Sequence, residues 1–312
     1  MHNSLSDYNQ AIQLNPNNAE AYNNRGIAYS KLKDYEKAIS DYNQAIQLNP
    51  NYAYAYNNRG IAYSKLKDYE KAISDYNQAI QLNPIYANAY NNRGNAYRNL
   101  KDYEKAISDY NQAIQLNPND AEAYNNRGNA YRNLKDYEKA ISDYNQAIQL
   151  NPNDAEAYNN RGNAYRNLKD YEKAISDYNQ AIQLNPNYAY AYNNRGNAYY
   201  DLKDYEKAIS DYNQAIQLNP NNAEAYNNRG IAYSKLKDYE KAISDYNQAI
   251  QLNPNDADAY YNRGIAYDDL KDYEKAISDY NQAIQLNPIY ANAYKNLGIS
   301  QINRLFQFFD FW

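Results

Sequence analysis

Glycine and proline recur at fixed intervals along this chain, and no other feature constrains its fold as strongly. The chain has 312 residues, and its nine Pro and nine Gly residues each recur every 34 residues. The two series begin at Pro16 and Gly26, and no Gly or Pro lies outside them. A period of this length is typical of solenoid proteins, in which short structural units stack on their neighbours. We therefore number a repeat so that Gly occupies position 8 and Pro occupies position 32.

This numbering predicts eight complete repeats over residues 19–290. They begin at Ala19, Ala53, Ala87, Ala121, Ala155, Ala189, Ala223 and Ala257. A half repeat, residues 1–18, precedes them, and a second half repeat, residues 291–302, follows. Residues 303–312 form an aromatic tail, for which we expect either a turn back onto the last repeat as a cap, or an unstructured end or cloning remnant.

Each repeat is expected to contain two amphipathic helices, an A helix and a B helix. In the fourth repeat, residues 121–134 and 136–150 each place apolar side chains three and four residues apart. Asp136 is expected to cap the B helix, because its carboxylate can accept a free N–H of the first turn. Pro152 stops this helix, because the residue before proline resists the α conformation. Gly128 costs about 1 kcal/mol relative to Ala within a helix, so its recurrence predicts close contact between the two helices.

Seven residues of the fourth repeat agree in type with a known repeat pattern, at positions 4, 8, 11, 20, 24, 27 and 32. They are Tyr124, Gly128, Tyr131, Ala140, Tyr144, Ala147 and Pro152. With this pattern in every complete repeat, the chain resembles the tetratricopeptide repeat family over residues 4–301. The resemblance implies an all-α fold in which antiparallel helix pairs stack into a right-handed superhelical solenoid. It also implies that the A helices line the concave face.

Position 7 departs from the family, because it holds Arg in all eight complete repeats where the family has Leu. We expect this Arg to be structural, its stem packed and its head paired with a carboxylate. In the fourth repeat the partner of Arg127 is either Asp143 at position 23 or Asp136 at position 16. The sequence does not choose between them.

The repeats differ only in the A helix and in the turn before it, since positions 15–32 are identical in all complete repeats. The resemblance places the variable positions on the concave face, where a ligand would lie. The variation therefore reflects either ligand contact or neutral drift at solvated sites. On the first interpretation, the candidate peptide-binding residues are Asn92, Asn126, Asn160, Arg98, Arg132, Arg166, Tyr54, Tyr190 and Tyr200.

These residue types suit a peptide for three reasons. An Asn amide offers donors and acceptors to an extended backbone, and some family members are known for an Asn ladder that the position 6 residues match. Arg pairs bidentately with carboxylates, which favours an acidic segment. Tyr supplies apolar contact area with a polar end. The alternative for the Asn residues is a hydrated polar face.

Several classes of function are disfavoured by composition. The chain has no Cys and one His, His2, and it lacks phosphate-binding and zinc-hydrolase motifs, so we expect no enzyme activity, no cofactor and no metal. A net charge of −5 lacks the basic excess of nucleic-acid binders. No apolar run approaches the ~20 residues that cross a bilayer. A cytoplasmic location is the default expectation.

The sequence therefore predicts a scaffold for protein–protein interaction that binds an extended peptide or a helix. Two alternatives stay open. The half repeats at the two ends could associate head to tail and give a self-assembling homo-oligomer. The array could instead be the repeat region of a larger enzyme or signalling protein.

Overall fold

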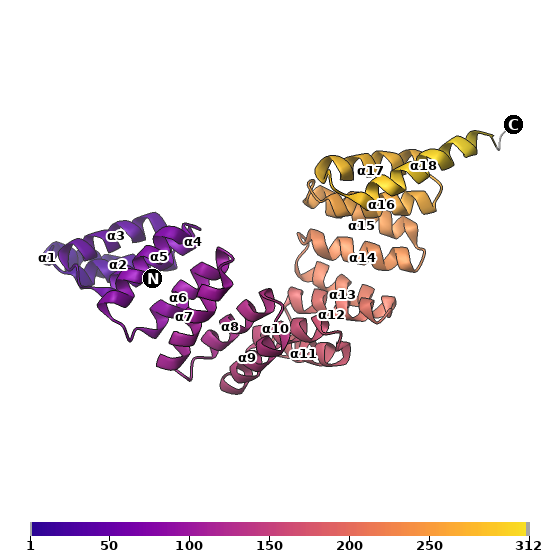
Figure 1. Cartoon of the computed structure of the whole chain (residues 1–312). Coiled ribbons are helices and arrows are strands. Elements are labelled where there is room, and N and C mark those ends of the chain that lie inside the picture. The colour runs from indigo at the N-terminus through magenta and orange to yellow at the C-terminus, as the bar shows by residue number, and fades with distance from the viewer. Residues whose placement is uncertain (1, 310–312) are drawn as a thin grey trace. The chain divides into compact units, whose positions relative to one another are not determined.

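The computed structural model describes the backbone of residues 2–309 and the side chains of residues 5–307, and its elements within that range are all α-helices (Figure 1). This confirms the predicted all-α fold of repeated helix pairs. Residues 310–312 and the side chains of His2, Phe308 and Phe309 lie outside the described part, and with them part of the predicted aromatic tail.

The A helices occupy positions 1–13 of each complete repeat. They are α2 (Ala19–Lys31), α4 (Ala53–Lys65), α6 (Ala87–Asn99), α8 (Ala121–Asn133), α10 (Ala155–Asn167), α12 (Ala189–Asp201), α14 (Ala223–Lys235) and α16 (Ala257–Asp269). The B helices are α3 (Tyr35–Leu48), α5 (Tyr69–Leu82), α7 (Tyr103–Leu116), α9 (Tyr137–Leu150), α11 (Tyr171–Leu184), α13 (Tyr205–Leu218), α15 (Tyr239–Leu252) and α17 (Tyr273–Leu286). The half repeats supply α1 (His2–Leu14) and α18 (Ala291–Phe309).

The turn between the two helices of a repeat is fixed by two residues. Lys135 adopts a left-handed backbone with φ 63°, which ends α8 and reverses the chain. Asp136 then caps α9, because its carboxylate accepts the backbone N–H of Lys139 at 3.3 Å. The ammonium group of Lys139 lies 2.7 Å from the same carboxylate. The predicted cap is therefore confirmed.

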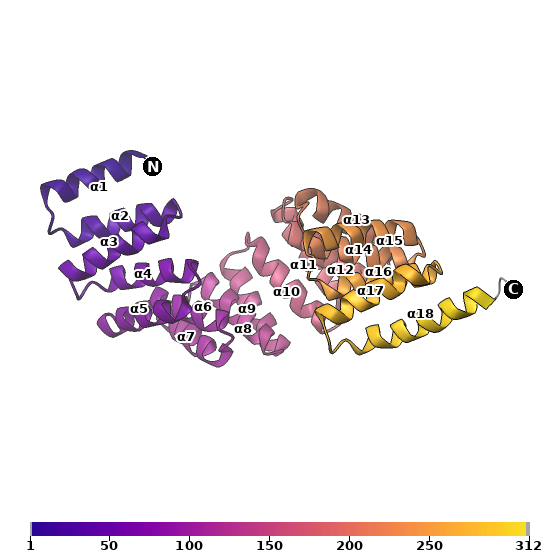
Figure 2. The same ribbon diagram turned by 90° about the horizontal axis from the view of Figure 1, so that it is seen from above.

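Two compact units divide the chain, residues 1–153 and 154–312, which we call the N-terminal and C-terminal units. Helices α1–α9 form the first and α10–α18 form the second (Figures 1 and 2). Within each unit, successive A helices contact one another, as α2 does α4 and α12 does α14. No two successive B helices of a unit do so among the described residues. Each stack therefore curves with its A helices on the inner side, which we call the inner face.

The core of each repeat is built from small residues around one tyrosine. Ala123, Ala130, Ala140 and Ala147 are buried in the fourth repeat, together with Tyr144. A Cβ placed on Gly128 would lie 2.7 Å from the ring carbon Cε1 of Tyr144. The glycine thus lets the B-helix tyrosine lie directly against the A-helix backbone, which confirms the predicted close contact and identifies its partner.

The last helix is longer than the other A helices. Helix α18 continues without a break to Phe309, so residues 303–309 extend the half repeat and do not turn back onto the last complete repeat. Figures 1 and 2 both show its final turns projecting beyond α16 and α17. Over residues 303–309 the fold-back cap and the unstructured end are therefore both wrong, because the helix continues there without a turn.

Candidate peptide-binding surface

The arginine at position 7 belongs to the set of contacts that holds the helices of each repeat together, which we call the frame. Nε and Nη2 of Arg127 donate to the two carboxylate oxygens of Asp143, at 2.8 and 2.6 Å. Nη1 donates to Asn111 of the preceding B helix at 2.7 Å, and the guanidinium lies 5.5 Å from the ring centre of Tyr124. The same bidentate bond to position 23 occurs in every complete repeat.

This contact settles the choice that the sequence left open. Asp136 already caps α9 and pairs with Lys139, whereas Asp143 is buried and faces Arg127. In the second repeat, hydrogen bonding to Asp75 raises the pKa of Arg59. The arginine head therefore joins the two helices of its own repeat to the preceding B helix, as expected of a structural residue.

The asparagines at positions 5 and 6 bond to one another between repeats. The amide nitrogen of Asn92 donates to Asn57 at 3.0 Å, and that of Asn126 donates to Asn91 at 3.2 Å. Asn126 and Asn160 are buried, with 8% and 7% of their surface exposed. The amide nitrogens of Asn92 and Asn126 thus have protein partners already, and these two residues contribute to stacking. Their contact with a peptide stays a prediction.

The buried tyrosine at position 24 obtains a hydrogen bond in two different ways. In repeats with Asn at position 9, its hydroxyl donates to that Asn, as Tyr110 does to Asn95 at 2.7 Å. In repeats with Ile at position 9 and Ser at position 12, the hydroxyl pairs with the serine, as Tyr76 does with Ser64 at 3.3 Å. Positions 9 and 12 therefore change together because a buried hydroxyl requires a partner.

The eighth repeat departs from both arrangements. It combines Ile265 with Asp268, and the hydroxyl of Tyr280 has no hydrogen-bond partner among the described atoms. Asp268 instead accepts a hydrogen bond from Ser300 of α18 at 2.8 Å.

The predicted arginines at position 12 differ in their surroundings. Nε of Arg166 lies 2.7 Å from the carboxylate of Asp201, within the C-terminal unit. Arg98 and Arg132 of the N-terminal unit are half-buried and form no ion pair with any described residue. Two exposed lysines at position 13 of the same unit, Lys31 and Lys65, likewise lack a described ion-pair partner. The inner face of the N-terminal unit therefore carries four cations that remain available to an anionic ligand.

The predicted tyrosines are unequal in exposure. Tyr54 and Tyr190 are 53% and 60% exposed. Tyr54 meets Tyr86 edge-on, with ring centres 5.0 Å apart, and burial raises the pKa of Tyr86 to about 12. Tyr200 is half-buried and lies 5.4 Å from the ring of Tyr205. Tyr54 and Tyr190 thus present aromatic surface to solvent, whereas Tyr200 contributes to packing as well.

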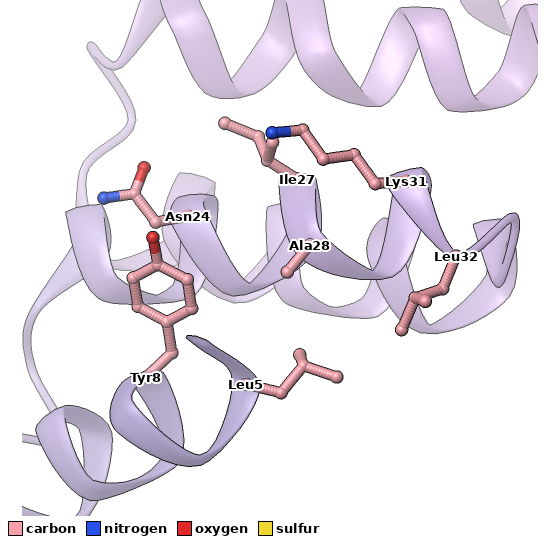
Figure 3. Close-up of a pocket in the computed structure, with 7 residues that line it drawn as sticks. All are labelled: Leu5, Tyr8, Asn24, Ile27, Ala28, Lys31 and Leu32. Atoms are coloured by element: carbon pink, nitrogen blue, oxygen red, sulfur yellow. The ribbon is translucent and has the colours of Figure 1, made fainter. Parts of the chain in front are cut away.

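Two hollows flank α2. The first has a volume of about 140 Å³ and lies between α1 and α2, where Leu5 and Tyr8 face Ala28 (Figure 3). The second has a volume of about 240 Å³ and lies between the first and second repeats. Its lining is Ile27, Ser30, Lys31, Tyr35, Tyr42, Asn58, Ile61 and Lys65. Sequence reasoning missed this second hollow, although Ile at position 9 beside Ser at position 12 was visible.

The described residues contain no group of three or more His, Asp or Glu side chains arranged to hold a metal ion. Within residues 2–309, no helix is both long enough and apolar enough to span a membrane. The arrangement on the inner face can offer hydrogen bonds, positive charge and apolar contact, which are the elements of a binding surface.

A comparison with protein families adds to this picture. The tetratricopeptide repeat model matches seven segments. They are residues 19–52, 53–86, 87–120, 121–154, 155–188, 223–256 and 257–290. The chain belongs to the tetratricopeptide repeat family. A related model for a TPR repeat matches residues 3–33 and 196–237. A second model for a tetratricopeptide repeat matches residues 177–210. The resemblance expected from the sequence is thus confirmed. A search of curated proteins found no match.

Solved tetratricopeptide repeat structures share the fold. In the APC/C hetero-tetramer Cut9–Hcn1, the similar chain has a TM-score of 0.68 at 20% identity over 85% of this chain. This chain spans only 52% of that one. A tetratricopeptide repeat protein of Parabacteroides merdae has a TM-score of 0.63 at 21% identity, covering 80% of this chain and 98% of the other. PilF of Pseudomonas aeruginosa has a TM-score of 0.61 at 21% identity, covering 68% and 96%.

Proposed function

We propose that this tetratricopeptide repeat chain is a non-enzymatic scaffold that binds a peptide or an extended protein segment on its inner face. The observation that carries the proposal is the set of unpaired cations on the inner face of the N-terminal unit, Lys31, Lys65, Arg98 and Arg132. A half-buried guanidinium without a carboxylate partner retains its capacity for two charge-assisted hydrogen bonds. An acidic segment supplies the acceptors that the protein itself does not.

The distribution of variation supports the same face. The B helices are identical in all complete repeats and present the same exposed residues each time, such as Ser74 and Ser108. The A helices differ from repeat to repeat, so the inner face offers a sequence of distinct contacts to a partner. Exposed aromatic surface at Tyr54 adds the apolar contact on which peptide binding generally depends.

A peptide array probed with the intact protein tests the proposal. Arg98→Glu combined with Arg132→Glu should abolish binding to the acidic peptides that capture the native chain, because the introduced carboxylates repel those of the peptide. The matched control replaces four exposed B-helix serines of the same unit by Glu: Ser40, Ser74, Ser108 and Ser142. Both variants change the net charge equally, so a similar loss in both would contradict binding on the inner face.

Self-association is a second candidate function, and one observation favours it. Ile302, Leu305 and Phe306 are exposed along one side of α18, and Leu14 is exposed at the end of α1. Apolar surface of this kind is typical of contact sites. Light scattering of the native chain and of a Leu305→Glu, Phe306→Glu variant tests it, since a monomeric native chain at high concentration excludes this function. A role within a larger protein and a cytoplasmic location stay predictions.

A further inference from the structure

The hollow between the first and second repeats combines an apolar floor with two flanking ammonium groups. Ile27, Ile61 and Tyr35 supply the apolar part of its lining, which we call the floor, and the exposed Lys31 and Lys65 supply the charged part, which we call the rim. We propose that this hollow binds an apolar side chain that stands next to a carboxylate in an acidic peptide. This inference rests on the proposed function and assigns a chemical class of ligand to one place on the inner face.

The hollow exists because of how these repeats satisfy the buried tyrosine. Ser30 pairs with the hydroxyl of Tyr42 at 3.2 Å, so position 9 needs no polar group and holds Ile27. In the third repeat, position 9 is Asn95, which is committed to its own tyrosine, and position 12 is the much larger Arg98. The combination of Ile and Ser therefore leaves space and an apolar surface that the combination of Asn and Arg does not.

The size and charge of the hollow fit one kind of occupant. A dry cavity of about 150 Å³ can hold a benzene ring, so a volume of about 240 Å³ accommodates a Leu or Phe side chain. Burying such a side chain contributes favourably in proportion to the apolar area removed from water. Lys31 and Lys65 have no described ion-pair partner, so a carboxylate beside the apolar side chain meets two unpaired positive charges of the lining.

The seventh and eighth repeats provide an internal control. Their matching positions hold the same apolar and polar residues, with Ile231 and Ile265 in place of Ile27 and Ile61. The rim differs, because the matching positions hold Lys235 and Asp269 where the first two repeats have two lysines. Burial and the carboxylate of Asp269 raise the pKa of Tyr239, which places this carboxylate beside the tyrosine that matches Tyr35. The same apolar residue types are thus combined with a carboxylate in place of one lysine, which disfavours an acidic ligand.

Fluorescence anisotropy with the full chain tests the proposal. The probe is a fluorescein-labelled peptide of alternating Asp and Leu, compared with peptides in which Ser replaces Leu or Lys replaces Asp. Lys65→Asp should weaken the Asp–Leu peptide about tenfold, since a tenfold change corresponds to about 1.4 kcal/mol. Lys235→Asp makes the same change of charge at position 13 of the seventh repeat and should alter affinity less than about twofold.

The reciprocal variant completes the test. Asp269→Lys should create a second site for the Asp–Leu peptide and raise the binding stoichiometry, because the rim of the seventh repeat then matches that of the first. Equal effects of Lys65→Asp and Lys235→Asp, or equal affinity for the Ser-containing peptide, would overturn the inference. Failure of the Asp–Leu peptide to bind the native chain would also overturn it. The proposed function is tested separately by the peptide array, and it fails if no peptide of any composition binds the inner face.

Discussion

The B helices and the A helices of this chain share one frame but differ in how freely they vary. The B helices of the complete repeats have identical residues, whereas the A helices change at positions 2, 5, 9, 12 and 13. Part of this change is tied to the frame, because Ser64 and Asn95 each complete the hydrogen bonding of a B-helix tyrosine. Lys31 and Lys65 make no such contact. Variation on the inner face thus divides into residues that serve the frame and residues left for a partner.

High pH should lower the folding stability of all complete repeats together. Burial raises the pKa of Tyr76, Tyr110 and Tyr246 above the ordinary value of 10. Above pH 10 the unfolded chain loses these protons first, so it binds fewer protons than the folded chain and stability falls as pH rises. Each tyrosine contributes a loss of up to about 1.4 kcal/mol per pH unit. The last part of the rise in tyrosinate absorbance, that of the buried tyrosines, should therefore coincide with the loss of helical circular dichroism. Helices that stay intact after all 42 tyrosines have ionised would contradict this account.

Removal of one arginine should be the next largest effect. Arg127→Ala leaves Asp143 buried without its bidentate partner, which should lower the free energy of unfolding by about 3 kcal/mol. The double variant Arg127→Met with Asp143→Leu replaces the ion pair by apolar contact and should recover most of this loss. Urea unfolding of the three proteins measures both values. A single variant as stable as the native chain would show that the pair does not hold the frame.

A methyl group at the contact between the helices should cost less. Gly128→Ala places a Cβ 2.7 Å from the ring of Tyr144, so the ring must shift, and we expect a net loss of about 2 kcal/mol. Gly298→Ala is the matched control, because no atom outside its neighbouring residues and the backbone of its own helix lies within 4 Å of the added Cβ. This control should gain up to about 1 kcal/mol from the higher helix propensity of Ala. Opposite signs for the two variants in thermal unfolding would confirm that close contact selects glycine.

The smallest expected effect tests whether positions 9 and 12 of the A helix are coupled through the hydroxyl of the buried tyrosine. Ile265→Asn should offer the unpartnered hydroxyl of Tyr280 an acceptor and stabilise the chain by about 1 kcal/mol. Ile231→Asn is the control, because Tyr246 already pairs with Ser234 at 3.2 Å and has nothing to gain. Urea unfolding should show a gain only for the first variant. A gain in both would mean that positions 9 and 12 are not coupled through the tyrosine.

Local sequence rules were sufficient to predict the fold. Pro152 marks the end of α9, Asp136 its beginning, and Gly128 the place where the two helices touch. These signals act within a few residues, and their repetition fixes the stack. The continuation of α18 to Phe309 was not foreseen, because residues 303–309 depart from the repeat and contain neither Gly nor Pro to stop a helix.

The surface could be predicted only in part, because its contacts lie between repeats. The sequence could not tell that Asn126 donates to Asn91, since the two are separated by a full repeat. It also could not assign Arg166 to Asp201, which differs from the residue at the same position in neighbouring repeats. The coupling of positions 9 and 12 was present in the sequence as a correlation among repeats, and the buried hydroxyl supplies its cause.

Site-specific photo-crosslinking tests most directly whether the inner face is the binding face. A photoreactive phenylalanine derivative replaces either Tyr54, exposed on the A helix of the second repeat, or Ser74, exposed on its B helix. The probe is an acidic peptide that binds the native chain in the peptide-array experiment. We predict that it is captured through position 54 and not through position 74, whereas capture through position 74 alone, or equally through both, would contradict binding on the inner face.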